Sequence, residues 1–205
     1  MSVVVAIKQD GVVYIGCDSQ VTRGGTRRTL SSVNNYKVWK VLGVDNVLMA
    51  HTGSVKDACA VRTMEDLITE YDIYRNRIEY GLIVNRVYPE IIDRLQHLQY
   101  LPKEKPFDAL NSSFLFAYKD KLFELASDGS VIEHEDYVTM GSGEDFARGS
   151  LSTTEEEEPN KRIIKAIKAS ASGDIYVNYP IILTNTENCE FIIVTEDNEK
   201  DFLNK

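Results

Sequence analysis

The order in which strand-like and helix-like segments alternate restricts the fold of this chain more than any other feature of its sequence. Apolar runs separated by short turn-forming segments predict two β-hairpins, at residues 3–8 with 12–17 and at 36–42 with 47–51. Further elements follow from the spacing of apolar residues. They are helices at 55–74 and 78–98, strands at 113–118, 121–126, 131–132 and 137–140, helices from 144 and over 160–170, and strands at 181–183 and 191–195.

Strands, two helices, strands, two helices and strands can be arranged as two antiparallel sheets packed between two helix layers. The early hairpins are nearly continuous in apolar residues, as expected where a sheet is covered on both faces. The chain has no internal repeat and no linker long enough to divide it. We therefore expect the α+β class, as a four-layer αββα sandwich. It forms one domain over residues 1–205, with residues 196–205 as a tail.

The composition indicates an acidic, soluble protein. A net charge of -9 argues against nucleic acid or an anionic membrane as a partner. No stretch approaches the length of a membrane span, and Lys8 interrupts the first apolar run too early for a signal peptide. Cys17, Cys59 and Cys189 lack the spacing of metal ligands and are expected to be reduced, buried thiols. These features predict a cytoplasmic protein.

A hydroxyl residue, Ser2, stands between the initiator methionine and the first predicted strand. Methionine is removed before small residues, so we expect the mature chain to begin with Ser2 and to carry a free α-amine there. An α-amine has an ordinary pKa of about 7.7–8.0, low enough for it to act as a base. One residue would then hold both nucleophile and base, which is how N-terminal-nucleophile enzymes hydrolyse amides.

Four short motifs follow Ser2 in a fixed order, and a fifth lies near the end of the chain. They are Gly-Cys-Asp-Ser-Gln-Val-Thr at 16–22, Tyr-Lys-Val at 36–38, His-Thr-Gly-Ser at 51–54, Gly-Ser-Gly at 141–143 and Ala-Ser-Gly-Asp-Ile-Tyr-Val at 171–177. In this order and spacing they resemble the proteasome β-subunit family, and most closely its bacterial HslV-type peptidase branch. The resemblance covers most of the chain and implies the N-terminal-nucleophile hydrolase fold.

The resemblance also implies a function. It predicts a threonine-type peptidase, here with serine as nucleophile, that forms homo-oligomeric, self-compartmentalising rings and degrades unfolded polypeptides. An ATP-dependent unfoldase is the implied partner. The chain itself has no Gly-rich loop followed by Lys and Ser or Thr, so the energy for unfolding would come from that partner.

The roles of the candidate catalytic residues follow from the resemblance and from amide chemistry. Ser2 Oγ would attack the scissile carbonyl after giving its proton to the Ser2 α-amine. Lys37 would favour deprotonation of Ser2 by its positive charge, and Asp18 would hold that lysine by a charge-assisted hydrogen bond. Gly53 would donate a backbone N–H to the oxyanion at a helix N-terminus. Ser142 would hydrogen-bond near the Ser2 amine.

The resemblance implies no required cofactor, but it does imply a structural monovalent or divalent cation. The backbone carbonyls of Gly173, Tyr176 and Tyr179 are its expected ligands. The arginines at positions 23, 27 and 28 suggest an exposed loop. His51 lies near the proposed site and is expected to be a packing or hydrogen-bonding residue.

Two other functions remain open at this stage. One is a small-molecule amidohydrolase or acylase with an N-terminal nucleophile, which would also accept serine. The other is a catalytically silent ring subunit that keeps the fold for assembly. Asp18, Lys37 and Ser142 favour the peptidase, because a silent subunit does not require a buried cation. The mass of the N-terminus discriminates further, since retained Met1 would block the amine.

Overall fold

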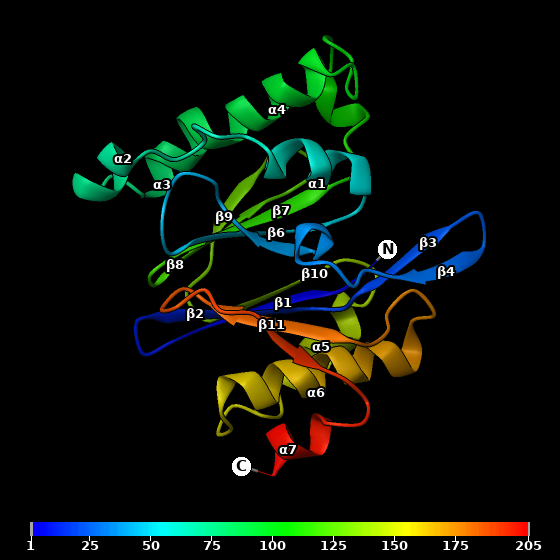
Figure 1. Ribbon diagram of the computed structural model, residues 1–205. Helices are drawn as coiled ribbons and strands as arrows, with labels where there is room; N and C mark the ends of the chain where they lie inside the picture. The colour runs from blue at the N-terminus through cyan, green and yellow to red at the C-terminus, as the bar shows by residue number, and fades with distance from the viewer. Residues whose placement is uncertain (1, 205) are drawn as a thin grey trace.

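Two five-stranded antiparallel sheets lie face to face between helices in the computed structural model, which describes residues 2–204 (Figure 1). Met1, and with it the expected removal of that residue, lies outside the described residues. The first sheet has the order β10-β1-β2-β11-β12. Its strands are β1 (Val4–Gln9), β2 (Val12–Cys17), β10 (Tyr137–Met140), β11 (Ile181–Asn185) and β12 (Ile192–Val194).

The second sheet has the order β5-β6-β7-β8-β9. Its strands are β5 (Val38–Lys40), β6 (Val47–Thr52), β7 (Ser113–Tyr118), β8 (Lys121–Leu125) and β9 (Val131–Glu133). The helices that cover this sheet are α1 (Val55–Arg62), α2 (Glu70–Tyr74), α3 (Tyr80–Leu82) and α4 (Tyr88–His97). The helices on the side of the first sheet are α5 (Glu144–Leu151), α6 (Pro159–Gly173) and the C-terminal α7 (Glu199–Leu203).

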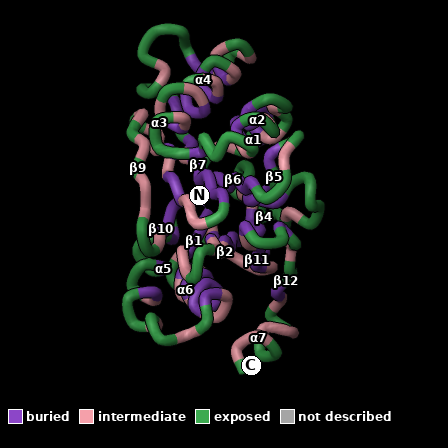
Figure 2. Tube along the Cα trace, turned by 90° about the vertical axis from the view of Figure 1, so that its left-hand side faces the viewer, coloured by how far each residue is buried: buried purple, intermediate pink, exposed green. Residues whose placement is uncertain are grey.

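Three buried apolar clusters separate the four layers, which explains why the strands are apolar on both faces. Val4 and Ala6 of β1 face the cluster between the two sheets, whereas Val5 and Ile7 face the cluster under α5 and α6. In the second sheet Leu48 of β6 belongs to the cluster between the sheets, whereas Val47 and Met49 belong to the cluster under α1 and α4. Figure 2 shows this buried interior between exposed helix surfaces. The predicted αββα sandwich is confirmed.

The helix predicted over residues 55–74 is wrong in its middle. α1 ends at Arg62, and α2 begins only at Glu70. A new helix starts there because Thr69 and Asp72 form a capping box, in which each side chain accepts the other's backbone N–H. Leu67 and Ile68 are buried in the non-helical segment between the two helices, so burial and not helical periodicity accounts for their spacing. Residues 80–97, by contrast, form one helical run with a π-helical stretch, Ile83–Val87, between α3 and α4.

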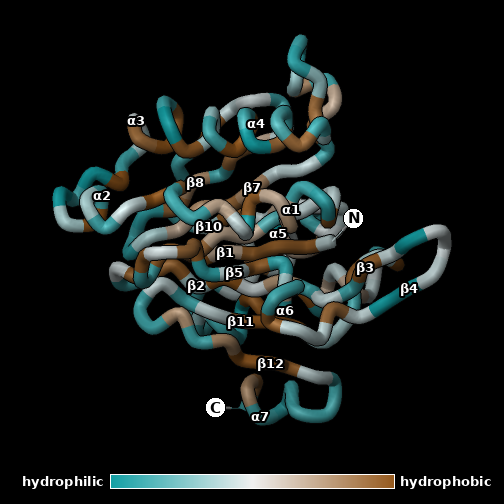
Figure 3. The backbone as a smooth tube through the Cα atoms, turned by 45° about the horizontal axis from the view of Figure 1, so that its top comes forward, coloured by the Kyte–Doolittle hydropathy of each residue, from teal (hydrophilic) through white to brown (hydrophobic). Residues whose placement is uncertain are grey.

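Residues expected to lie in an exposed loop form a hairpin instead. β3 (Gln20–Arg23) pairs with β4 (Thr26–Thr29) in a separate two-stranded sheet. Figure 3 shows this hairpin extending away from the sandwich, with β4 in hydrophilic colours. Every residue of β4 is exposed, so the alternation of apolar and polar residues that reveals half-buried strands is missing from the sequence.

Two smaller expectations are also corrected. The described part of the expected tail, residues 196–204, contains α7, which is held by Lys168 Nζ on Glu199 Oε1 at 2.6 Å and by Phe202 packed on the core. Cys59 is exposed, whereas Cys17 and Cys189 are buried as expected. Burial raises the pKa of the Cys17 thiol to about 12, which keeps it protonated. No helix within residues 2–204 is long and apolar enough to cross a membrane.

Candidate active site

Ser2 lies immediately before β1 and is only 2% exposed. Its backbone nitrogen donates to Ser142 Oγ at 3.1 Å, and its carbonyl accepts the Gly143 N–H at 3.2 Å. Ser142 Oγ also donates to the Ser2 carbonyl, at 3.4 Å. The turn between β10 and α5 therefore fixes the start of the chain from two directions. Ser142 is 140 residues from Ser2 in the sequence and meets it only because β10 pairs with β1.

Glycine is required at position 141 for this contact. Gly141 has φ +100°, and a Cβ added there would lie 2.3 Å from the Ser2 carbonyl oxygen. A side chain at this position would therefore displace the residue that carries the candidate nucleophile.

We expect Gly141→Ala to lower peptidase activity at least about tenfold, because a displacement of about 1 Å is enough to misalign a reacting group. Gly11→Ala is the matched control, since Gly11 also has positive φ, +80°, but a Cβ there would meet nothing within 4 Å. Both variants should lose some thermal stability. Peptide cleavage per folded chain measures the difference, and equal activities in the two variants would show that the Ser2–Gly141 contact is irrelevant.

A buried ion pair lies beside Ser2. Lys37 Nζ and Asp18 Oδ1 are 2.6 Å apart, and their side chains are 4% and 0% exposed. The Asp18 carboxylate also accepts the backbone N–H groups of Val3 and Gln20, each at 2.9 Å. Because three donors satisfy the carboxylate, the cost of burying its charge is offset, and Lys37 in turn keeps a charged partner. Asp18 thus links the first residues of β1 to the lysine.

Gly53 lies in the turn between β6 and the N-cap of α1. Its φ is +106°, and a Cβ there would lie 2.0 Å from the Asn111 carbonyl oxygen, so only glycine fits. Within residues 2–204 the Gly53 N–H donates to no protein acceptor. The N–H lies at the positive end of α1, where an oxyanion is favoured.

One small cavity joins these groups. It has a volume of about 200 Å³ and is lined by Ser2, Gln20, Val21, Thr22, Lys37, His51, Gly53, Ser54 and Val55. Three of the five residues predicted to be catalytic, Ser2, Lys37 and Gly53, line this cavity. The other two contact them, with Ser142 against the backbone of Ser2 and Asp18 behind Lys37. The contribution of β3 was not foreseen from the sequence. Gln20 is held by donating Nε2 to Thr22 Oγ1 at 3.0 Å and to the Ile175 carbonyl at 2.9 Å.

His51 lines the cavity and is also buried, with 3% exposed. Its ring lies 5.9 Å from that of Trp39, and its Nδ1 has no hydrogen-bond partner within the described chain. Burial, together with the positive charges of Lys37 and Arg62, lowers the pKa of His51 to about 3. The imidazole is therefore neutral at ordinary pH and is a poor general base. This agrees with the expectation that His51 lies near the site as a packing residue.

The segment expected to bind a cation follows α6. Gly173 is the last residue of that helix, and Tyr176 and Tyr179 lie in the loop that leads to β11. This loop supports the site, because Ser19 N–H donates to the Asn178 carbonyl at 3.2 Å. Asp174 Oδ2 in the same loop is buried without a hydrogen-bond partner in residues 2–204, which fits a cation nearby. No cluster of His, Cys, Asp or Glu suited to a metal occurs within residues 2–204, and the cation site on these backbone carbonyls stays a prediction.

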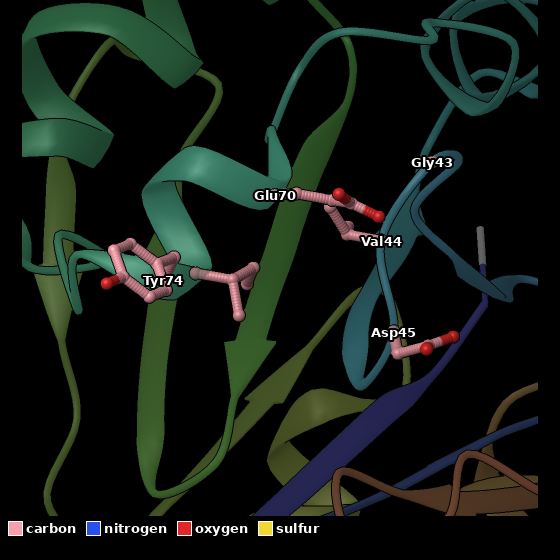
Figure 4. A pocket seen from close by; sticks show the side chains of 6 residues that line it. Gly43, Val44, Asp45, Glu70 and Tyr74 are labelled. Carbon is pink, nitrogen blue, oxygen red and sulfur yellow. The ribbon is translucent and has the colours of Figure 1, made fainter.

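A larger hollow of about 680 Å³ lies elsewhere, between the β5–β6 turn and α2. Figure 4 shows Asp45 on the turn and Glu70 and Tyr74 on the helix. Its lining residues include none of those around Ser2 and bring no nucleophile next to a base. The smaller cavity beside Ser2 is therefore the candidate active site.

Comparison with known proteins agrees with this arrangement. The profile of the family described as "Proteasome: Proteasome subunit" matches residues 2–184. The chain belongs to the proteasome subunit family. The ATP-dependent protease subunit HslV of Borreliella burgdorferi (strain ZS7) is 27% identical over 196 residues, which cover 90% of this chain and 96% of the relative.

Solved structures of proteasome-like subunits share the fold. Eukaryotic HslV from Trypanosoma brucei matches with a TM-score of 0.64 at 18% identity, over 89% of this chain and 98% of that one. BPH from Thiobacillus denitrificans in complex with epoxomicin matches with a TM-score of 0.66 at 17% identity, over 94% and 99%. The resemblance read from the five motifs is confirmed at the level of family and fold.

Proposed function

We propose that this chain is a peptidase subunit whose mature N-terminal residue, Ser2, is the nucleophile. The observation that carries the proposal is the cavity that Ser2, Lys37 and Gly53 line together. Ser142 holds the backbone of Ser2, and Asp18 holds Lys37. The relatives named as ATP-dependent protease subunits support the same reaction class.

The proposed reaction begins with the free Ser2 amine after removal of Met1. The amine takes the proton of Ser2 Oγ, directly or through one water, while Oγ attacks the carbonyl carbon of the scissile peptide bond. The Lys37 ammonium disfavours a second positive charge on the amine and stabilises the developing alkoxide. Ser142 Oγ, at 3.1 Å from the Ser2 nitrogen, keeps the amine oriented.

The tetrahedral intermediate places its negative oxygen near the Gly53 N–H. When the intermediate collapses, the protonated Ser2 amine gives its proton to the leaving amine of the substrate, and an ester to Ser2 Oγ remains. The amine then takes a proton from water, the hydroxide attacks the ester, and Ser2 Oγ is released with its proton. No cofactor enters these steps. A cation held by the carbonyls of Gly173, Tyr176 and Tyr179 would stabilise the loop under Gln20.

The substrate we propose is an extended polypeptide. β3 pairs with β4 along one edge only, and residues 20–22 line the cavity opposite residues 53–55. A peptide in extended conformation can add to such a strand edge through backbone hydrogen bonds, which are independent of its sequence. An unfolded chain fits this geometry better than a small amide does.

The first test combines the mass of the N-terminus with peptide cleavage. We expect the purified chain to begin at Ser2 and to hydrolyse fluorogenic peptides. A chain that wholly retains Met1 and cleaves nothing would favour a catalytically silent ring subunit, while cleavage of small amides alone would favour an acylase.

We propose that the subunits form homo-oligomeric rings and receive substrate from an ATP-dependent unfoldase. The relatives are named as ATP-dependent protease subunits, which supports an assembly that uses ATP. Large exposed apolar side chains support burial against other subunits. They include Tyr71, Tyr74, Tyr80, Phe107, Phe146 and Ile175.

Light scattering on the purified protein should therefore give the mass of a closed oligomer, because the exposed apolar surface is buried on assembly. The same measurement in 1 M NaCl is the control, since apolar interfaces survive salt that screens surface charge. A stable monomer at micromolar concentration would contradict the ring and would favour the acylase.

A further inference from the structure

A chain of buried hydrogen bonds reaches the Gly53 turn from the side opposite to Ser2. The Ser54 N–H donates to Ser112 Oγ at 3.0 Å, and Ser112 Oγ donates to Asp57 Oδ2 at 2.8 Å. Ser112 and Asp57 are 1% and 2% exposed, so both hydrogen bonds are protected from water. Of the three residues, only Ser54 lines the cavity.

This arrangement is a modified helix cap. Ser54 is the N-cap of α1, but its own side chain makes no capping hydrogen bond. Asp57 occupies the third helical position, from which a carboxylate usually accepts the N-cap N–H directly. Here the Ser112 hydroxyl, from the segment before β7, stands between the two groups. The cap thus ties the start of α1 to the strand that pairs with β6.

The same segment packs against Gly53. A Cβ on Gly53 would lie 2.0 Å from the Asn111 carbonyl oxygen and 2.8 Å from Ser112 Cα, so residues 111–112 form the wall behind the turn. Since Ser112 holds the N–H of Ser54, that group is not free to bind an oxyanion. The turn then offers the neighbouring Gly53 N–H alone, and its direction depends on how firmly residues 53–54 are held against this wall.

Asp57 has a feature that a simple cap does not need. Its Oδ1 is buried and has no hydrogen-bond partner within residues 2–204, and burial raises the pKa of the carboxyl. A buried carboxyl group with an unsatisfied oxygen costs free energy. Its only side-chain partner in the described chain is Ser112, through which it reaches the turn.

We propose that Ser112 and Asp57 are positioning residues, which hold the Gly53 N–H toward the scissile carbonyl through the Ser112 hydrogen bond to Ser54. This inference rests on the proposed peptidase function. Both residues lie outside the cavity, yet they would control the direction of the oxyanion donor. Ser112 is 58 positions from Ser54 and 55 positions from Asp57 in the sequence.

The test compares Ser112→Ala with variants that keep the hydrogen bonds. Ser112→Ala should lower kcat about 10- to 100-fold with little change in KM, because the donor acts on the transition state more than on the bound substrate. Binding of a peptide aldehyde, which forms a tetrahedral adduct with the nucleophile, should weaken by the same factor. Ser112→Thr keeps the hydroxyl and Asp57→Asn keeps an acceptor, so both should retain most of the wild-type kcat.

A second helix cap in this chain provides the matched control. Thr69 and Asp72 cap α2 and do not line the cavity beside Ser2. Thr69→Ala should lower Tm by about 2–4 °C, as loss of a cap does in a chain of this size, without changing kcat or aldehyde affinity per folded chain. Native mass spectrometry of the aldehyde adduct gives the fraction of chains that can bind the aldehyde. This fraction separates partial unfolding of Ser112→Ala from a slower reaction in the chains that are folded.

The outcomes distinguish this inference from the function on which it rests. If wild type cleaves peptides and Ser112→Ala matches it in kcat and aldehyde affinity, the positioning role is wrong and the peptidase stands. A parallel loss of kcat and aldehyde affinity, recovered in Ser112→Thr, supports the positioning role. If wild type beginning at Ser2 cleaves no peptide and binds no aldehyde, the proposed function and this inference are both overturned.

Discussion

Replacing Ser2 with alanine is expected to abolish peptide hydrolysis in a chain that still folds and assembles. The variant removes the proposed nucleophile, the hydroxyl carried by the same residue as the N-terminal amine, so we expect a fall of about 10⁴-fold or more. The backbone contacts of residue 2 to Ser142 and Gly143 use no side-chain atom of Ser2 and should persist. Cleavage of fluorogenic peptides by chains of verified N-terminal mass measures the loss.

Ser2→Thr is the matched control for this prediction. Threonine keeps the hydroxyl and adds a methyl group that restricts χ1, so activity should be retained. Hydrolysis by Ser2→Ala at a rate near that of wild type would remove Ser2 from the mechanism. Equal losses in Ser2→Ala and Ser2→Thr would instead indicate that the site does not tolerate change at residue 2.

Replacing Lys37 with methionine is expected to remove most activity and to destabilise the fold. Methionine fills much of the same volume but leaves the buried Asp18 carboxylate without its cation, which costs about 3–5 kcal/mol in buried pairs. Activity should fall about 10²-fold or more, since Ser2 loses the positive charge beside it. Lys8→Met is the control, because Lys8 forms a 2.7 Å ion pair with Glu135, whose side chain is 77% exposed and stays solvated when the lysine is removed.

A double variant separates the two effects of Lys37. The double variant Lys37→Met with Asp18→Asn leaves neither charge of this pair in the interior. The introduced side-chain amide can still accept one backbone N–H, so thermal stability should partly recover. Activity should not recover, because the cation is still missing. If activity returned together with stability, Lys37 would be a structural residue only.

The cavity residues differ in how visible they were in the sequence. Asp18, Lys37 and Gly53 stand at strand ends inside recognisable motifs, and the structure brings them together with Ser2. Gln20 belongs to such a motif too, but its role as a wall of the cavity depends on the hairpin formed by β3 and β4. His51 was expected near the site as a packing residue, but its neutral state follows from burial and from the charges of Lys37 and Arg62, which local sequence does not show.

The errors in the fold have related physical causes. Local periodicity predicted a helix through residues 63–69, where burial of Leu67 and Ile68 by other elements sets the spacing instead. The β3–β4 hairpin was missed because β4 is polar and wholly exposed, and therefore lacks the pattern of a half-buried strand. Cys59 was expected to be buried, yet it is exposed on α1, while its neighbours Ala58 and Ala60 are buried.

The amino-acid sequence by itself determined the αββα layering, the two early hairpins and the motif residues around Ser2. Apolar spacing and turn chemistry act over a few neighbouring residues, so they are readable without coordinates. The family resemblance predicted that Ser142 meets Ser2 across 140 residues, but only the tertiary structure decided that Ser112 meets Asp57 across 55. These hydrogen bonds form when β10 pairs with β1 and β7 pairs with β6, and strand pairing between distant segments leaves no local mark in the sequence.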